Sequence, residues 1–203
     1  VDDPEDQVIE ASAGGWDAVQ SFVENYTLPA HVEQLELNSI DFLGSMPIRG
    51  HGNAGDNQIR GNLNDNVLTG GEGDDLLWGA IGNDDLSGGS GNDTFYVDKV
   101  GFNGADTVHD VSNSGEGNRI QFGAAIRPSD VTFTQNATSL FVAVGSAGDG
   151  LLLENFDLSG ITGSLVADTI VFGKESQELD GGFEVSLTAM MAPTRGTNDS
   201  ETM

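Results

Sequence analysis

The chain has 203 residues, of which 37% are hydrophobic, so it can form one large or two small domains with a modest core. Its 33 acidic residues against 7 basic ones give a formal net charge of -26, which excludes nucleic-acid binding and disfavours an anionic membrane surface as a partner. There is no cysteine for disulfides or thiolate metal sites, and no apolar run of the roughly 18 residues that a membrane-spanning helix needs. A chain this acidic repels itself unless cations bind, so a cation is the first partner to expect.

Residues 1–49 are predicted to form a β-rich N-terminal flank. Alternating polar and apolar residues predict strands at Asn25–Leu28 and His31–Leu37, and Trp16–Glu24 is also interpreted as a strand. The acidic opening, VDDPEDQVIE, has no signal-peptide pattern, and we expect it to be the cut end of a longer chain.

A nine-residue repeat begins at Gly52 and runs for five rows: GNAGDNQIR, GNLNDNVLT, GGEGDDLLW, GAIGNDDLS and GGSGNDTFY. Glycine opens every row. The sixth position is always Asn or Asp, and the eighth is always apolar: Asn57, Asn66, Asp75, Asp84 and Asp93, then Ile59, Leu68, Leu77, Leu86 and Phe95. A flexible Gly/Asp-rich linker is the alternative, and five aligned glycines with five aligned apolar residues argue against it.

The residue types explain what one row can form. Glycine tolerates positive φ and lets backbone carbonyls approach an ion, so six residues turn and three extended residues follow. In those three, the eighth side chain points inward and its neighbours point outward. One apolar residue per row makes no core, but stacked rows make a continuous ladder. The sequence therefore predicts an all-β fold containing a parallel β-roll.

The rows resemble the calcium-binding nonapeptide G-G-x-G-x-D-x-U-x of the repeats-in-toxin (RTX) family. Rows three to five match closely, whereas the first two have Asn at the sixth position and Asn64 replaces the inner glycine of row two. The resemblance implies a short right-handed roll of about two and a half turns over residues 50–98, with two rows per turn. Loops two rows apart then stack and hold an ion between them.

The cation implied by the resemblance is Ca²⁺, which prefers about 6–8 oxygen ligands. The strongest site pairs Asp75 with Asp93, and two weaker sites pair Asn66 with Asp84 and Asn57 with Asp75, giving two to three ions. For Asp56, Asp65, Asp74 and Asp85 a solvent-exposed role is favoured. Further metal ligands, mainly backbone carbonyls, are expected from the turns at Gly52, Ala54, Gly61, Leu63, Gly70, Gly71, Glu72, Gly73, Gly79, Ala80, Ile81, Gly82, Gly88, Gly89, Ser90 and Gly91.

Residues 99–189 are predicted to form a C-terminal β-meander that caps the open end of the roll, and residues 190–203 are predicted to be a disordered tail. The meander is expected to pack on the last turn through Phe102, Phe122 and Phe133. Its opening segment, residues 97–110, repeats the pattern of residues 1–10, so we expect another glycine row upstream of Val1. The predicted strands are Arg119–Phe122, Val131–Gln135, Leu140–Val144, Leu151–Phe156 and Thr169–Phe172.

No catalytic arrangement is recognisable, since the sequence lacks H-E-x-x-H, G-x-S-x-G and cysteine. The scattered His31, His51 and His109 are interpreted as satisfied or solvent-exposed side chains. The chain is therefore predicted not to be an enzyme.

Three functional hypotheses remain open. The first, implied by the resemblance, is a calcium-dependent module of a larger bacterial protein that leaves the cell through the type I secretion apparatus and folds outside. The second is an adhesive or carbohydrate-binding module that meets extracellular polysaccharide or a cell surface through Arg60, Trp78 and Tyr96, although packing of a flank over the rings is favoured. The third is the C-terminal part of a secreted enzyme whose catalytic domain lies elsewhere.

Overall fold

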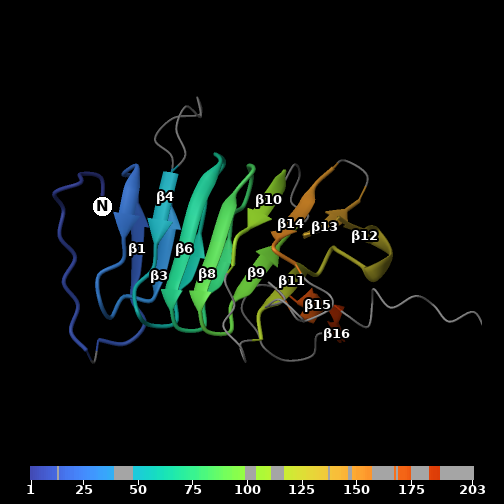
Figure 1. Cartoon of the computed structure of the whole chain (residues 1–203). Coiled ribbons are helices and arrows are strands. Elements are labelled where there is room, and N and C mark those ends of the chain that lie inside the picture. The colour runs from blue at the N-terminus through green and yellow to red at the C-terminus, as the bar shows by residue number, and fades with distance from the viewer. Residues whose placement is uncertain are drawn as a thin grey trace, which may run out of the picture.

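The structure is a computed structural model that describes residues 1–12, 14–38, 48–98, 104–110, 117–136, 138–145, 148–156, 167, 169–174 and 183–187. These residues form sixteen strands and one short 3₁₀ turn, η1 (Pro128–Asp130), so the all-β prediction is confirmed. The strands build two eight-stranded sheets that share one core (Figure 1).

Sheet A contains, in spatial order, β1 (Ala18–Ser21), β3 (Gln34–Leu37), β5 (Gln58–Arg60), β7 (Leu76–Trp78), β9 (Thr94–Val97), β11 (Arg119–Gly123), β15 (Thr169–Lys174) and β16 (Phe183–Ser186). Sheet B contains β12 (Val131–Gln135), β13 (Ser139–Val144), β14 (Gly150–Glu154), β10 (Ala105–Val108), β8 (Asp85–Ser90), β6 (Asn66–Glu72), β4 (Ile48–His51) and β2 (Asn25–Thr27). Successive strands alternate between the sheets from β3 to β11, as a solenoid requires.

The glycine rows stack in the predicted register, two rows per turn. In sheet A, Ile59 lies opposite Leu77 and Leu77 opposite Phe95, while Leu68 lies opposite Leu86 in sheet B. Each of these five side chains is 2% exposed or less. Burial of such a side chain stabilises the fold by about 1.5–3 kcal/mol, so the eighth positions supply much of the core energy of the rows.

The roll is longer than the predicted two and a half turns, which is a correction to the expectation from the repeats. Val19 pairs with Leu35, Leu35 with Ile59, and Phe95 with Ile120, all in parallel strands, so residues on both sides of 50–98 add rungs to the same ladder. The result is a β-solenoid of about four turns. The added rungs are 16, 24 and 25 residues apart instead of 18 (35−19, 59−35, 120−95), which hides them from a search for a fixed period.

The N-terminal flank differs from its predicted strands in one respect. β1 lies within Trp16–Glu24 and β2 within Asn25–Leu28, as expected. β3 begins only at Gln34, because His31 has a φ of 68°, a left-handed conformation that interrupts an extended strand. The Val1 ammonium donates a hydrogen bond to Gln20 O at 2.9 Å, so the first residue lies beside β1, the edge strand of sheet A.

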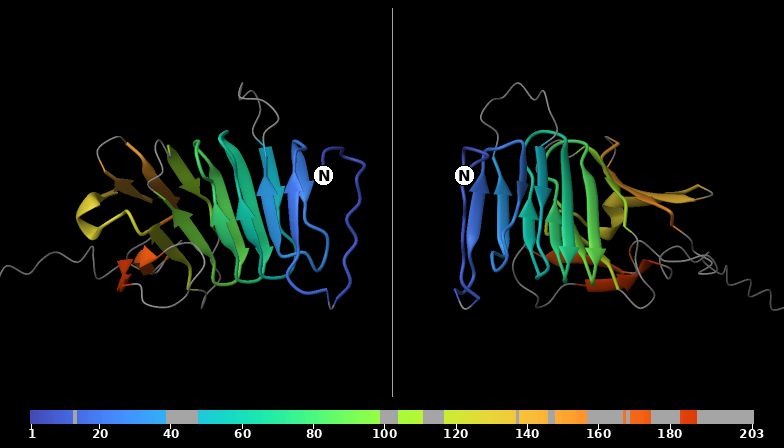
Figure 2. Two further views of the ribbon diagram at one scale, coloured as in Figure 1. Left: turned by 180° about the vertical axis from the view of Figure 1, so that it is seen from behind. Right: turned by 60° about the vertical axis from the view of Figure 1, so that its left-hand side comes forward.

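The C-terminal meander is present. β12, β13 and β14 are antiparallel neighbours, and β14 joins the solenoid by parallel pairing with β10 (Figure 2). Of the three phenylalanines expected to join meander and roll, Phe122 is fully buried, Phe133 packs partly buried against the core, and Phe102 lies outside the described residues. The predicted tail, 190–203, also lies outside them. β10 and β16 were not predicted.

Candidate metal centre

The sixth-position side chains form two buried ladders, one beside each sheet. Ladder A runs beside sheet A: the N–H of Asn57 donates to Oδ1 of Asp75 at 2.7 Å, and the N–H of Asp75 donates to Oδ1 of Asp93 at 2.9 Å. Ladder B runs beside sheet B, where the N–H of Asn66 donates to Oδ1 of Asp84 at 2.7 Å. All five residues are 2% exposed or less. The structure therefore brings together each of the three predicted pairs.

Both ladders continue past the glycine rows. In ladder B the N–H of Asp84 donates to Oδ1 of Asp106 at 3.0 Å, and in ladder A the N–H of Asp93 donates to Oδ1 of Asn118 at 2.7 Å. Asp106 and Asn118 are 6% and 1% exposed. Neither residue was among the predicted site residues.

A sequence signal for Asp106 does exist. GFNGADTVH, from residue 101, has glycine at positions one and four, Asp at six and Val at eight, so it is a sixth row. It escapes detection because Phe replaces the second glycine and four residues separate it from the fifth row. Gly104 confirms the assignment: its φ is 81°, and a Cβ there would collide with the carbonyl oxygen of Gly82. Asn118 lacks any comparable glycine pattern.

Two carboxylate oxygens in the ladders are buried without a hydrogen bond from the described residues. Within the described part of the chain, Oδ2 of Asp75 and Oδ2 of Asp84 have no hydrogen-bond partner. Burial, aided by the nearby Asp93 carboxylate and opposed by the hydrogen bond from the Asn57 N–H, raises the pKa of Asp75 to about 7. Burial likewise raises the pKa of Asp84 and of Asp106, and the Asp84 charge adds to the effect on Asp106. A bound cation would remove this cost.

In the glycine turns, backbone atoms of one turn approach those of the adjacent turn closely. Gly89 has a φ of 110°, and a Cβ on it would collide with the carbonyl oxygen of Gly71 in the adjacent turn. A Cβ on Gly88 would collide with the Asp93 carboxylate. Glycine at the first two positions therefore keeps open the space in which carbonyl and carboxylate oxygens meet. Ala80 takes the second position of row four with a φ of 77°, at an expected cost of about 1–3 kcal/mol.

The ligand set for a cation here must be mainly backbone. Among the residues that the structure describes, no three His, Cys, Asp or Glu side chains gather as a metal-binding group. One or two carboxylates and several turn carbonyls are the alternative, and that donor set consists of hard oxygen atoms. The assignment of the individual turn carbonyls as ligands stays a prediction.

The fifth-position acids lie outside this buried region. Asp56, Asp65 and Asp74 are exposed, and each accepts a hydrogen bond from a backbone N–H 18 residues further along, as between Asp74 N–H and Asp56 Oδ1 at 2.9 Å. These acids therefore make the same hydrogen bond between turns as the sixth-position residues, but at the surface, where their charge is solvated. Asp85, at a seventh position, is half-buried and faces His109 at 3.4 Å.

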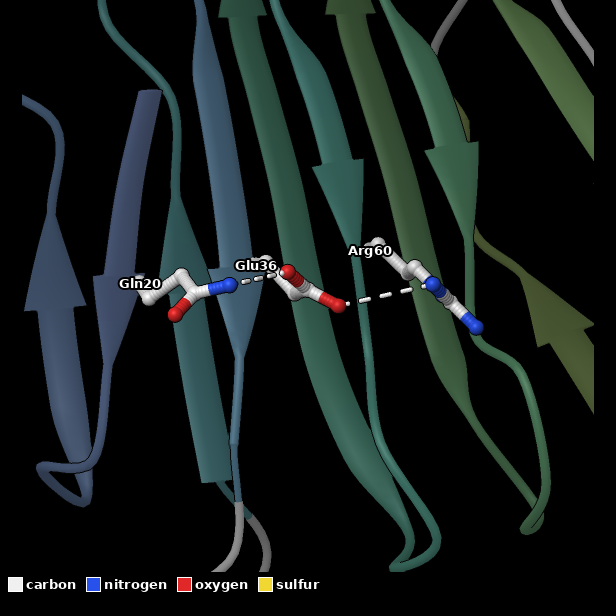
Figure 3. Close-up of polar contacts among 3 residues, drawn as sticks. All are labelled: Gln20, Glu36 and Arg60. Carbon is white, nitrogen blue, oxygen red and sulfur yellow. Dashed lines mark hydrogen bonds and ion pairs between the residues drawn. The ribbon is translucent and has the colours of Figure 1, made fainter.

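The predicted aromatic face belongs to a ladder of ninth-position side chains on sheet A. Gln20 donates to Glu36 at 2.9 Å, Glu36 pairs with Arg60 at 3.4 Å (Figure 3), and the Arg60 guanidinium lies 4.3 Å from the centre of the Trp78 ring. Trp78 meets Tyr96 edge to face at 5.2 Å, and Tyr96 is only 5% exposed. Tyr96 is therefore buried, whereas Trp78 is only partly buried. The packing of a flank over both rings stays a prediction.

Comparison with known protein families locates a match on these same rows. The model of the RTX calcium-binding nonapeptide repeat, which comprises four copies, matches residues 51–86 and residues 60–95. No curated protein matches the chain. The matched segment contains the five rows whose loops stack two by two, with the buried sixth-position carboxylates between them. Residues 51–95 of the chain thus consist of RTX calcium-binding nonapeptide repeats.

Proposed function

We propose that the chain is a module that folds when calcium binds outside the cell, and that its folding supports the secretion and stability of a larger bacterial protein. The observation that carries the proposal is a pair of buried oxygens, Asp75 Oδ2 and Asp84 Oδ2, that have no hydrogen-bond partner among the described residues. A carboxylate in this position destabilises the metal-free fold, and a divalent cation reverses the effect.

Calcium fits the donor set of the ladders. Asp75 and Asp93 would hold one ion and Asp84 a second, with turn carbonyls from Gly70 to Gly91 completing the shells, and two to three ions are proposed in all. Ca²⁺ accepts a flexible shell of such oxygens, whereas Mg²⁺ demands a tighter octahedron and gives up its waters reluctantly.

Coupling of binding to folding follows from the register. The loops of each pair are 18 residues apart and meet only in the folded solenoid, so the unfolded chain has no preformed site. Binding free energy then appears as folding free energy. The net charge of -26 acts in the same direction, because each ion removes two negative charges from the most repulsive region.

Coupling of folding to calcium binding suits a protein that is exported from the cell. RTX repeat proteins are typically secreted by bacteria, and an export channel of the type I apparatus would accept an unfolded chain in the low-calcium cytosol. We further propose that these residues act structurally and carry no catalytic step.

Among the described residues, no helix has the length and apolarity to cross a membrane.

Calcium titration of the whole chain after chelator treatment tests the proposal. Circular dichroism should report a rise in β-structure as calcium approaches ~10⁻⁴–10⁻³ M, the range of extracellular modules, with little response to magnesium. Calorimetry on the same sample counts the ions, and limited proteolysis should show protection of the whole solenoid only with calcium. A chain that is already fully β-structured and protease-resistant in chelator would overturn the proposal.

A further inference from the structure

One sixth-position oxygen occupies the same place in each of the five loops, but its hydrogen bonding differs between the Asn rows and the Asp rows. A Cβ on the first glycine of each row would collide with one sixth-position oxygen of that row: Asn57 Oδ1, Asn66 Oδ1, Asp75 Oδ2, Asp84 Oδ2 and Asp93 Oδ2. We call this oxygen the inner oxygen of the loop. In rows three and four, where it belongs to Asp75 and Asp84, it has no hydrogen-bond partner among the described residues.

In row one the inner oxygen is satisfied by the protein. Oδ1 of Asn57 accepts a hydrogen bond from the N–H of Asn53 at 2.7 Å. The other end of the amide, Nδ2, donates to Val32 O at 3.2 Å in the preceding turn and to Asn53 Oδ1 at 3.3 Å. Asn53 adds two further bonds from its own Nδ2, to Pro29 O at 2.8 Å and to Val32 O at 2.7 Å.

Row two repeats the arrangement on the other side of the solenoid. Oδ1 of Asn66 accepts from the N–H of Asn62 at 2.8 Å, and Nδ2 donates to Asn62 Oδ1 at 3.2 Å and to Ile48 O at 3.4 Å. Asn62 Nδ2 is buried without a partner in the described region, but it is a hydrogen-bond donor and offers a cation nothing.

The two kinds of row also differ at the second position. Rows one and two have Asn at positions two and six, whereas rows three to five have Gly or Ala at position two and Asp at position six. An Asn pair brings donors as well as acceptors into the loop, and a carboxylate brings acceptors alone. The amide donors thus bond to oxygens that would otherwise need a cation.

We propose that Asn57 and Asn66, each with its second-position Asn, close the first two loops without calcium. The turns from β1 to β6 then form a calcium-independent base, and the turns that contain Asp75, Asp84 and Asp106 stack on it as calcium binds. This inference rests on the proposed function, because it divides one ladder into a hydrogen-bonded part and a calcium-dependent part. It also replaces the expectation that each Asn row contributes a weak calcium ligand.

Hydrogen exchange of the whole chain, resolved by segment, tests the division without any substitution. In chelator, amides of β3 to β6 should exchange on the order of 10-fold more slowly than amides of β7 to β10, and calcium should protect both segments. Equal, rapid exchange of both segments in chelator, with full protection by calcium, would overturn the inference and leave the proposed function intact. Protection of both segments in chelator would overturn the proposed function itself.

A double variant tests the cause. Asn57→Asp with Asn66→Asp replaces both amides by carboxylates, so protection of β3 to β6 should become calcium-dependent and calorimetry should count more bound calcium. Asn83→Asp with Asn92→Asp is the matched control, because it adds the same charge at exposed fifth positions that already carry Asp in three other rows. If both double variants lose protection equally, charge and not the amide bonding is responsible, and the inference fails.

Discussion

Asp75 and Asp93 are joined by a hydrogen bond of 2.9 Å from the backbone N–H of the first to Oδ1 of the second, 18 residues further along the chain. Asp75 in turn accepts from the N–H of Asn57. Asp75 therefore lies between two turns: Oδ1 accepts a hydrogen bond from the protein, and Oδ2 has no partner in the part of the chain that the structure describes.

Asp75→Ala should be the most damaging single change at the ladders. It leaves the buried N–H of Asn57 unsatisfied, at a cost of about 1–3 kcal/mol, and removes a ligand shared by two adjacent loops. The calcium midpoint measured by circular dichroism should rise roughly 10-fold or more, with Asp93→Ala next in rank. Asp74→Ala, at the exposed neighbouring position, is the control and should change the midpoint little. An unchanged midpoint in Asp75→Ala would contradict the metal site.

Asp106→Ala should raise the calcium requirement although the residue lies outside the matched repeats. Its Oδ1 accepts from the N–H of Asp84, so the loss affects the neighbouring carboxylate as well. Calorimetry should record weaker binding or one ion fewer. Asp65→Ala, which removes only a surface acceptor beside the same sheet, serves as the comparison. Identical binding in the Asp106 variant and the unmodified chain would remove the sixth row from the site.

Without calcium, acid should stabilise the fold. The pKa of Asp75 rises from 3.8 to about 7 on folding, so the folded state takes up a proton that the unfolded state has lost. The resulting stabilisation is fully present below about pH 4 and disappears as the pH rises through 7. In chelator, denaturant midpoints should therefore be higher at pH 5 than at pH 8. In calcium the midpoint concentration of the ion should be higher at pH 5, because protons and calcium compete for the same oxygens.

Gly89→Ala should prevent close stacking of rows three and five. The residue has a φ of 110°, and its Cβ would meet the carbonyl oxygen of Gly71. Gly145→Ala is a control for backbone strain alone, because its φ is 73° but a Cβ there has open space around it. We expect the control to cost about 1–2 kcal/mol in thermal or denaturant unfolding, and Gly89→Ala to cost more. Equal losses would mean that the close approach is unimportant.

Removal of the residues after Asp98 should leave rows three to five unable to fold in calcium. β9 would lose its partner β11, and β8 would lose β10, so the last turn would expose both its apolar interior and its backbone edges. Circular dichroism of residues 1–98 at millimolar calcium should show far less β-structure than the full chain. A full β-signal from residues 1–98 would show that the meander is not needed as a cap.

The sequence alone determined the glycine rows, their apolar ladder and the carboxylates beside it. These features repeat because each row must make the same turn and bury the same eighth residue, and a local requirement of that kind leaves a fixed period. The register of two rows per turn, and with it the pairs Asp75–Asp93 and Asn66–Asp84, was predictable from the resemblance of these rows to the RTX repeat.

Only the tertiary structure decided where the solenoid ends and how its polar groups are used. Leu35 and Ile120 join the apolar ladder across loops of irregular length, and Asn118 completes ladder A without the glycine pattern of the nonapeptide rows before it. The reason is that a long-range contact requires two residues to meet but does not fix the number or type of residues in the loop between them. The amide of Asn57 bonds to Val32 O for the same reason. Such a hydrogen bond depends on which turn is stacked next to the row. Tertiary packing determines that neighbouring turn, and the nine residues of the row do not.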